Sequence, residues 1–139
     1  MIFLDTSSAI QILNGNNSLE SLIEKFEDDY FGITTPSIFE LYHGIYKLKL
    51  LKKKISEQKY NELYIDLENF VNQFTTFSLN EEAANYAAKI HIELKAKGQE
   101  IEVFDCLIAA IILTNNYKKI ITLNQKHFQK IEKLEVYSF

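Results

Sequence analysis

Short apolar runs alternate with longer stretches of helical periodicity, and this alternation constrains the fold more than any other feature of the chain. The apolar runs lie at residues 2–4, 30–34, 74–77, 119–123 and 134–137. Between them, apolar residues recur at intervals of three and four, which is typical of helices packed on one side. The pattern predicts an α/β domain with a mostly parallel sheet, about five strands and six or seven helices.

The composition fits one domain that builds its core without covalent staples. The chain has 139 residues, of which 47% are hydrophobic, and a domain of this size buries about two-thirds of its unfolded surface. We therefore expect a single domain over residues 1–139. The only cysteine, Cys106, excludes an intramolecular disulfide and a cysteine-based zinc site, so we expect it to be a small buried residue.

The first residues and the apolar runs argue against export and membrane insertion. Met1 to Leu4 are followed at once by Asp5, so we expect no signal peptide. The longest apolar run, residues 106–113, is about half the roughly 18 residues that a membrane helix needs. We therefore expect a soluble cytoplasmic protein with no membrane contact.

Capping residues mark the expected ends of two helices. Thr35 is expected to cap a helix whose first residue is Pro36, where the missing N–H costs nothing. Ser78 and Glu81 have the spacing of a capping box, and the long helix that follows is expected to end at Gly98.

Three acidic residues deserve separate consideration. Asp5 directly follows the first strand, at the sheet edge where open α/β folds bind ligands, although a plain N-cap role fits equally well. Glu40 follows Pro36 on a helix and, taken alone, fits a solvated side chain. Asp105 lies near the start of an apolar helix at residues 103–114, where an ionised carboxylate is costly unless it is paired or binds metal.

Such acids indicate a hard cation with oxygen ligands. With one cysteine and three histidines in the chain, Mg²⁺ or Mn²⁺ is favoured over zinc. Clustered carboxylates repel one another unless a cation neutralises them. One or two such ions activate water and stabilise the leaving oxygen of a displacement at phosphorus.

Three segments contain these acids, and a fourth follows them in the chain. The segments are residues 3–7 (FLDTS), 36–41 (PSIFEL), 104–110 (FDCLIAA) and 121–128 (ITLNQKHF). Together the segments resemble the PIN domain family, and more narrowly the VapC ribonuclease toxins of prokaryotic toxin–antitoxin pairs. The resemblance spans nearly the whole chain. It implies a PIN-like three-layer sandwich, in which a five-stranded parallel sheet has helices on both faces.

The same resemblance implies a function. It implies a Mg²⁺-dependent (or Mn²⁺-dependent) endoribonuclease that leaves 5′-phosphate and 3′-hydroxyl ends, a homodimer, and a cognate antitoxin in the active-site groove. Asp5, Glu40 and Asp105 match the acids of the family. Asp5 and Asp105 would be direct metal ligands, and Glu40 would complete the site directly or through water.

Four further residues align with family positions. Thr6 and Thr122 match small hydroxyl positions that would orient ligands or water. Asn124 stands where a fourth acid is common, which leaves one-metal and two-metal chemistry open. His127 stands where many relatives have an acid; it either contacts phosphate or is a surface residue, and we favour the surface.

The charge is unevenly distributed along the chain. The formal net charge is −4, and all fifteen basic residues are lysines. Residues 45–60 contain six lysines against one glutamate, and residues 114–134 contain five lysines against one glutamate. These stretches either hold an RNA backbone near the acids or are solvated faces. The candidate RNA-binding residues are Lys52, Lys53, Lys54, Lys118, Lys119 and Lys126.

Two other functions remain open on the sequence. One is a PIN-like module that binds RNA or protein without cutting, since Asn124 replaces an acid. The other is an aspartyl-phosphate phosphohydrolase of the haloacid dehalogenase type, which also has an aspartate after its first strand. That class normally needs a second aspartate two residues later, where this chain has Ser7.

Overall fold

The computed structural model describes residues 1–26 and 29–139, and in this part of the chain five strands form one parallel sheet. The sheet order is β3-β2-β1-β4-β5, so the chain first builds one half of the sheet and then crosses to the other. The strands are β1 (Ile2–Leu4), β2 (Phe31–Thr34), β3 (Thr75–Phe77), β4 (Lys119–Ile121) and β5 (Glu135–Tyr137). The predicted α/β fold with five parallel strands is confirmed.

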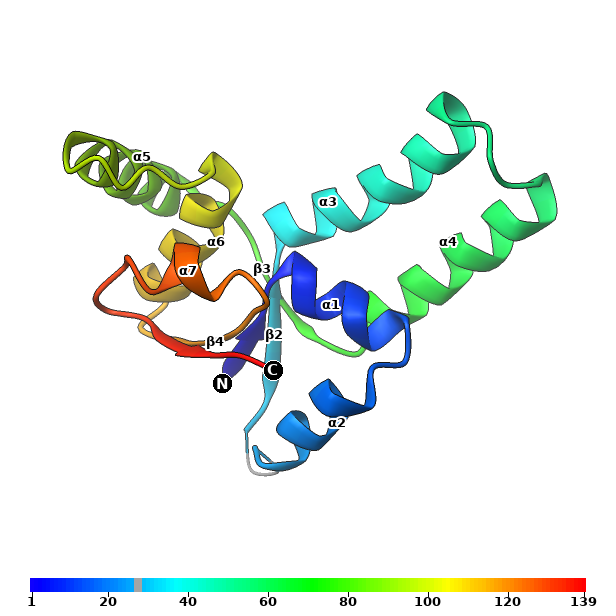
Figure 1. Cartoon of the computed structure of the whole chain (residues 1–139), viewed down its shortest axis with the longest axis horizontal. Coiled ribbons are helices and arrows are strands. Elements are labelled where there is room, and N and C mark those ends of the chain that lie inside the picture. Colours follow the sequence, from blue (N-terminus) through cyan, green and yellow to red (C-terminus); the bar gives the residue numbers. More distant parts are fainter. Residues whose placement is uncertain (27–28) are drawn as a thin grey trace.

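Helices connect the strands and cover both faces of the sheet (Figure 1). They are α1 (Thr6–Leu13), α2 (Asn17–Glu24), α3 (Thr35–Tyr46), the π-helical turn η1 (Lys47–Leu51), α4 (Glu57–Val71), α5 (Glu81–Ala96), α6 (Val103–Thr114) and α7 (Gln125–Phe128). Successive side chains of β1 point to opposite faces. Phe3 packs in the core formed with α5 and α6, whereas Ile2 and Leu4 pack with α1 and α2. The three-layer arrangement therefore follows from the alternation within one short strand.

Helix α6 is the central core helix, as its uniformly apolar sequence predicts. Seven of its twelve residues are buried, among them Cys106 and Asp105. The burial of Cys106 confirms its assignment as a small core residue. Within residues 1–26 and 29–139, no helix is long and apolar enough to cross a membrane.

Two predicted caps are displaced by a residue or two. The residue that precedes α3 is Thr34, and Thr35 is already helical; its hydroxyl accepts a hydrogen bond from the Leu79 N–H at 3.0 Å instead. Asn80, not Ser78, caps α5, because its side-chain oxygen accepts from the Ala83 N–H at 2.9 Å.

The end of α5 matches the prediction. Helix α5 ends at Ala96, and Gly98 has φ +70°, the left-handed conformation expected just after a helix.

Helices α3 and α4, joined through η1, form an arm that projects from the sheet (Figure 1). We call residues 35–71 the arm. Tyrosine rings on α3 and α4 face one another along it, with Tyr42 and Tyr64 centroids 5.5 Å apart. At the end of the arm, Leu50 and Leu51 are 67% and 76% exposed beside a group of lysines. The arm thus carries the first lysine-rich stretch away from the sheet.

Candidate active site

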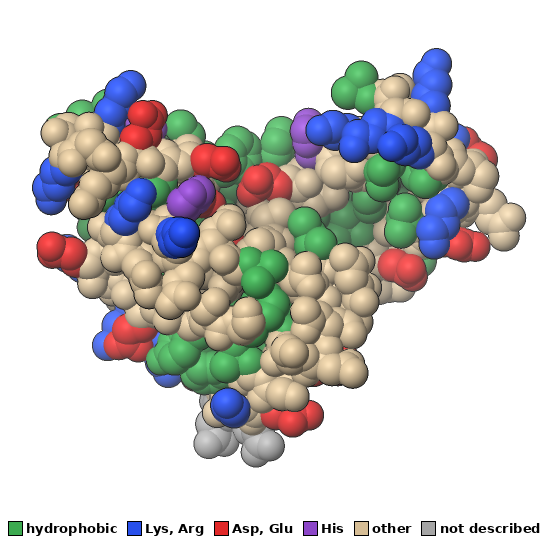
Figure 2. Space-filling view, in the orientation of Figure 1, with side chains coloured by type: hydrophobic (Ala, Val, Ile, Leu, Met, Phe, Trp, Pro, Cys, Tyr) green, Lys and Arg blue, Asp and Glu red, His purple; other side chains and the backbone are tan. Residues whose placement is uncertain are grey.

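The carboxyl ends of β1 and β4 place two buried polar residues side by side. Leu4 and Ile121 are partners in the register of these two strands, and Asp5 and Thr122 follow them directly. Both side chains are buried, Asp5 with 1% and Thr122 with 0% of its surface exposed. Acidic side chains gather in the hollow between the lobe of α5 and α6 and the arm (Figure 2).

Asp5 is both a helix cap and the centre of a hydrogen-bond cluster. Its Oδ1 accepts from the Ser8 N–H at 2.9 Å, which caps α1. The Ser7 hydroxyl lies 2.8 Å from Oδ1 and 2.9 Å from Oδ2, and the Thr122 hydroxyl donates to Oδ2 at 2.5 Å. The two roles that the sequence left open therefore coexist in one side chain.

The hydroxyls around Asp5 also fix the loop that follows β4. Thr122 Oγ1 accepts from the Asn124 N–H at 2.8 Å, and Ser7 Oγ accepts from the Leu123 N–H at 3.0 Å. Ser7 was not singled out from the sequence as a site residue. Its position two residues after an aspartate that ends a strand, in the first turn of the helix, was the available signal. The side chain of Asn124 is exposed and does not cap α7. Asn124 therefore joins the hydrogen-bond cluster around Asp5 through its backbone N–H and not through its side-chain amide.

Glu40 comes to the cluster from the arm. The Thr6 hydroxyl donates to Glu40 Oε1 at 2.7 Å, which links α1 to α3. Burial raises the pKa of Glu40; the Thr6 hydrogen bond opposes this rise, and the negative charges of Asp105, Asp5 and Glu102 add to it. Glu40 is therefore half-buried and held in place, unlike an ordinary solvated glutamate.

Asp105 reaches the same hollow from the first turn of α6. Its side chain lies 2.6 Å from the ring of His127, between Oδ2 and Nδ1. Burial raises the pKa of Asp105, the contact with His127 opposes the rise, and the charges of Asp5 and Glu102 add to it. His127 is about one-third exposed, in keeping with the expected surface position, but it is not only a surface residue, because the four-residue helix α7 turns its ring onto Asp105.

Glu102 is an acid near the hollow that was not predicted from the sequence. It is the residue before α6, three positions ahead of Asp105, and its side chain is exposed. Its negative charge raises the pKa of both Glu40 and Asp105. The fourth acid near this hollow is therefore Glu102, and not a residue at position 124. The Glu-x-x-Asp spacing at a helix start was the signal for it.

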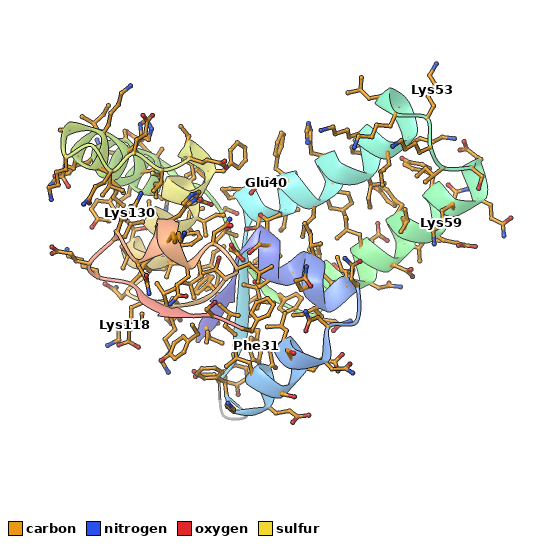
Figure 3. The ribbon with its side chains drawn as sticks, viewed as in Figure 1. Phe31, Glu40, Lys53, Lys59, Lys118 and Lys130 are labelled. Carbon is orange, nitrogen blue, oxygen red and sulfur yellow. The ribbon has the colours of Figure 1, made fainter. Side chains whose placement is uncertain are left out.

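The six candidate lysines lie in different places. Lys52, Lys53 and Lys54 are exposed at the end of the arm, and Lys126 is exposed on α7. Lys118 and Lys119 lie at the amino end of β4, whereas Asp5 and Thr122 follow the carboxyl ends of β1 and β4. Figure 3 shows Lys118 well away from Glu40. Both are in ion pairs, Lys118 with Glu135 at 2.6 Å and Lys119 with Asp29 at 3.1 Å. The structure does not bring these two lysines to the acidic hollow.

The side chains in the hollow have the donor atoms that a hard cation prefers, but they are not grouped closely enough to enclose one. The acids supply only oxygen donors; burial raises the pKa of Glu40 and Asp105, and their mutual repulsion adds to the rise. Within residues 1–26 and 29–139, however, no three His, Cys, Asp or Glu side chains are grouped so that they could hold one ion as they stand. Mg²⁺ commonly uses one or two carboxylates and keeps several waters, so two of these acids with water satisfy it.

The acids gather at the carboxyl end of a five-stranded parallel sheet, where its two halves meet between β1 and β4. This fold and this position of the acids are those of a PIN domain. A family model of the PIN domain matches residues 2–134, and the chain belongs to this family. Ribonuclease VapC of Rickettsia bellii (strain RML369-C) is 33% identical over 135 residues, which are 97% of this chain and 93% of that protein. The resemblance inferred from the four sequence segments is therefore confirmed, and the chain is VapC-like.

Solved structures share the fold at lower identity. VapBC2 from Rickettsia felis, bound to a DNA fragment from its promoter, has a TM-score of 0.82 at 23% identity and covers 100% of this chain and 99% of that chain. DNA-bound VapBC from Salmonella typhimurium has a TM-score of 0.80 at 21% identity, over 99% of this chain and 98% of that chain. These likenesses confirm the PIN-like three-layer fold.

Proposed function

We propose that the chain is a metal-dependent endoribonuclease that acts on cytoplasmic RNA as the toxin of a toxin–antitoxin pair. The observation that carries the proposal is the convergence of Asp5, Glu40 and Asp105, from three separate segments, in one hollow. Membership of the PIN domain family and 33% identity to a ribonuclease VapC support the same activity.

Asp5 and Asp105 are the residues proposed to hold Mg²⁺ or Mn²⁺. Both are buried carboxylates, and buried charges of this kind are normally paired or bound to metal. Ser7 and Thr122 orient Asp5, while Glu40, whose Oε1 is held by Thr6, has Oε2 available for a water molecule. Because the described residues, 1–26 and 29–139, contain no ready three-acid cage, a role for Glu40 through water is favoured.

The proposed reaction is hydrolysis of an RNA phosphodiester bond. A bound cation would supply an activated water and charge compensation for the leaving oxygen. With such a cation bound, Glu40 would accept a proton from the attacking water, and the buried hydroxyl of Thr122 would keep Asp5 from turning away. Attack by water at phosphorus with departure of the 3′ oxygen leaves a 5′-phosphate and a 3′-hydroxyl. Lys126 and the arm lysines would contact flanking phosphates.

The decisive experiment compares the protein with its Asp5→Asn variant. Asparagine is as good a helix cap as aspartate, so this change removes the charge while leaving the start of α1 intact. We expect the protein to bind Mg²⁺ or Mn²⁺ in calorimetry and to cleave RNA only with the cation, and the variant to lose both. Equal cleavage by the two proteins would contradict the proposal. A folded protein that binds neither cation would favour a module that only binds RNA or protein.

We infer that an antitoxin segment occupies an apolar groove next to Glu40. The groove lies between α1 and the arm and has a volume of about 300 Å³. Its walls include Ile10 and Leu13, which are 42% and 39% exposed, and its acidic groups are Glu40 and Asp66. These features suit a peptide with apolar side chains and a cationic side chain near Glu40. Solved relatives are VapBC complexes, which supports an antitoxin as this partner.

This part of the proposal is tested with the protein encoded next to the gene. We expect the partner to form a stable complex and to inhibit RNA cleavage. The variant Leu13→Glu should still cleave RNA but escape inhibition, since this side chain is exposed and lies at the end of α1 that is farther from Asp5. Full inhibition of this variant would contradict the assignment of this groove.

We also propose that the chain forms a homodimer. Large apolar side chains are exposed on and beside α5 and α6, among them Ile92 at 61% and Val103 at 54%. They border an apolar groove of about 330 Å³ between these helices, which suits a second copy of the chain. Light scattering should give a dimer for the protein and a monomer for Ile92→Glu. A dimer in both cases would place the interface elsewhere.

A further inference from the structure

His127 is held against Asp105 by the way α7 is anchored. Its side chain is 35% exposed, and its Nδ1 lies 2.6 Å from Asp105 Oδ2. The next residue, Phe128, is fully buried in the core with α6. Because one neighbour is locked in the core, the backbone of α7 cannot shift without unpacking Phe128, and the imidazole is presented to Asp105 in a fixed direction.

The same segment is also tied to Asp5. Thr122 donates to Asp5 Oδ2 and accepts from the Asn124 N–H at 2.8 Å. The Asn124 carbonyl in turn accepts from the His127 N–H at 3.0 Å. A continuous set of hydrogen bonds over residues 122–127 therefore connects the two acids proposed to hold the cation.

We propose that His127 is a positioning residue that fixes Asp105 for cation binding, and that residues 122–127 thereby set the relation of Asp105 to Asp5. An ionised carboxylate only accepts hydrogen bonds, so Nδ1 carries the hydrogen of this contact. Oδ2 is then held by the imidazole and Oδ1 is left for the cation. The inference rests on the proposed function, since it concerns the same cation.

The experiment measures Mn²⁺ and Mg²⁺ binding by calorimetry for substitutions that separate the donor from its position. In His127→Asn the amide nitrogen takes the place of Nδ1, whereas in His127→Gln it takes the place of Nε2. His127→Leu has no donor at all. We expect the Leu and Gln variants to bind the cation about 10- to 100-fold more weakly, the usual effect of losing a partner of a metal-binding carboxylate, and the Asn variant to bind close to wild type.

A matched control is His91→Ala. His91 on α5 also contacts a carboxylate, Glu100, at 3.2 Å, but this carboxylate is half exposed and is not among the groups whose charges raise the pKa of Glu40 or Asp105. Its loss should leave cation affinity unchanged. The metal-free melting temperature of every variant shows that it is folded, and the one-third exposure of His127 makes gross unfolding an unexpected result.

Four results would overturn the inference. Cation affinity equal to wild type in His127→Leu, or equal affinities of the Asn and Gln variants, would show that donation from Nδ1 does not matter. Directly bound nitrogen in pulsed EPR of the Mn²⁺ complex would make His127 a ligand instead. If the wild-type protein binds neither cation, the proposed function fails as well, and the two failures are thus distinguished.

Discussion

The hydroxyl of Thr122 donates to Asp5 Oδ2 at 2.5 Å, although 117 residues separate the two in the sequence. Both side chains are buried, and each directly follows a strand at the centre of the sheet. The contact exists because β1 and β4 pair in parallel, which brings their carboxyl ends to the same edge. The strand register therefore brings the acid and the hydroxyl that orients it together.

Replacement of Thr122 by valine should weaken both the fold and the site. Valine keeps the shape but removes the donor to Asp5 and the acceptor of the Asn124 N–H. We expect a loss of about 1–3 kcal/mol in the free energy of unfolding, measured in urea without metal. Cation affinity in calorimetry should fall about 10-fold or more. Thr122→Ser keeps the hydroxyl and should keep most of the affinity; equal weakening by Ser and Val would contradict the role of the hydroxyl.

Replacement of Glu40 by glutamine should stabilise the metal-free protein while impairing cleavage. Burial and the charges of Asp105, Asp5 and Glu102 raise the pKa of Glu40, so its ionised form is unfavourable in the folded state. Removing that charge at pH 7 should raise the melting temperature by about 1–3 °C, and RNA cleavage should fall sharply. The control is Glu62→Gln on the exposed face of α4, which should change neither. A lower melting temperature for Glu40→Gln would contradict the prediction.

The raised pKa values of Glu40 and Asp105 also predict how stability depends on pH. Their ordinary values are 4.5 and 3.8, and the folded protein binds both protons more tightly than the unfolded chain does. The stability that these protons contribute is complete below the ordinary values and is lost as pH rises through the raised folded values.

Thermal unfolding without metal should reveal this dependence. The melting temperature should be higher in mildly acidic buffer than at pH 7, and the difference should shrink in the double variant Glu40→Gln, Asp105→Asn. An unchanged pH dependence in the double variant would assign the effect to other groups.

Most of the fold follows from local pattern, and the limits of prediction lie where tertiary packing decides. The strands and the buried helix α6 can be predicted from the sequence, because the faces that an element buries determine the spacing of its apolar residues. The π-helical turn at Lys47–Leu51 is not visible, because its sequence continues a helical pattern while the Lys52 N–H bonds to the Lys47 carbonyl instead.

The candidate site was predictable in its acids but not in its hydrogen bonds. Asp5 and Asp105 stand out because a carboxylate beside apolar residues is unusual. The contact of His127 with Asp105 depends on the anchoring of α7 by Phe128, which no local pattern reveals. The sequence wrongly suggests a position near the acids for Lys118 and Lys119, because they are close to Thr122 in the chain. Strand β4 extends between them and Thr122, so they lie at the opposite end of the strand from the hollow.

The close packing of β1 on β2 makes one glycine a sensitive test of the fold. A Cβ on Gly32 would lie 2.8 Å from Phe3 Cε1 and 3.0 Å from Met1 Sδ. Phe3 is fully buried and packs edge-on against Phe77, with 5.0 Å between the two ring centroids, so its ring has little room to move. Gly32→Ala should cost about 1–3 kcal/mol of unfolding free energy, whereas Gly44→Ala, with nothing within 4 Å, should be neutral or stabilising. Equal stabilities would contradict the packing argument.

The lysines at the end of the arm should contribute to RNA affinity and not to the chemical step. Lys53 follows η1 at the tip of the arm, whereas Glu40 lies in the half of α3 nearer the sheet (Figure 3), so only an extended RNA reaches both. The triple variant Lys52→Gln, Lys53→Gln, Lys54→Gln should raise KM for long RNA and leave kcat unchanged. The slope of log affinity against log salt should become shallower by up to about 2, since each phosphate contact on a single strand contributes roughly 0.7.

Two controls make this prediction specific to the arm. A short oligonucleotide that cannot span the arm should be cleaved equally by wild type and triple variant. Lys118→Gln removes a lysine that pairs with Glu135 at the other edge of the sheet, and it should leave the KM for long RNA unchanged. Because lysine contacts phosphate as a point charge without bidentate geometry, the effect of the arm should disappear at high salt. A loss of affinity in the triple variant that persists at high salt would show that the arm binds RNA by something other than charge.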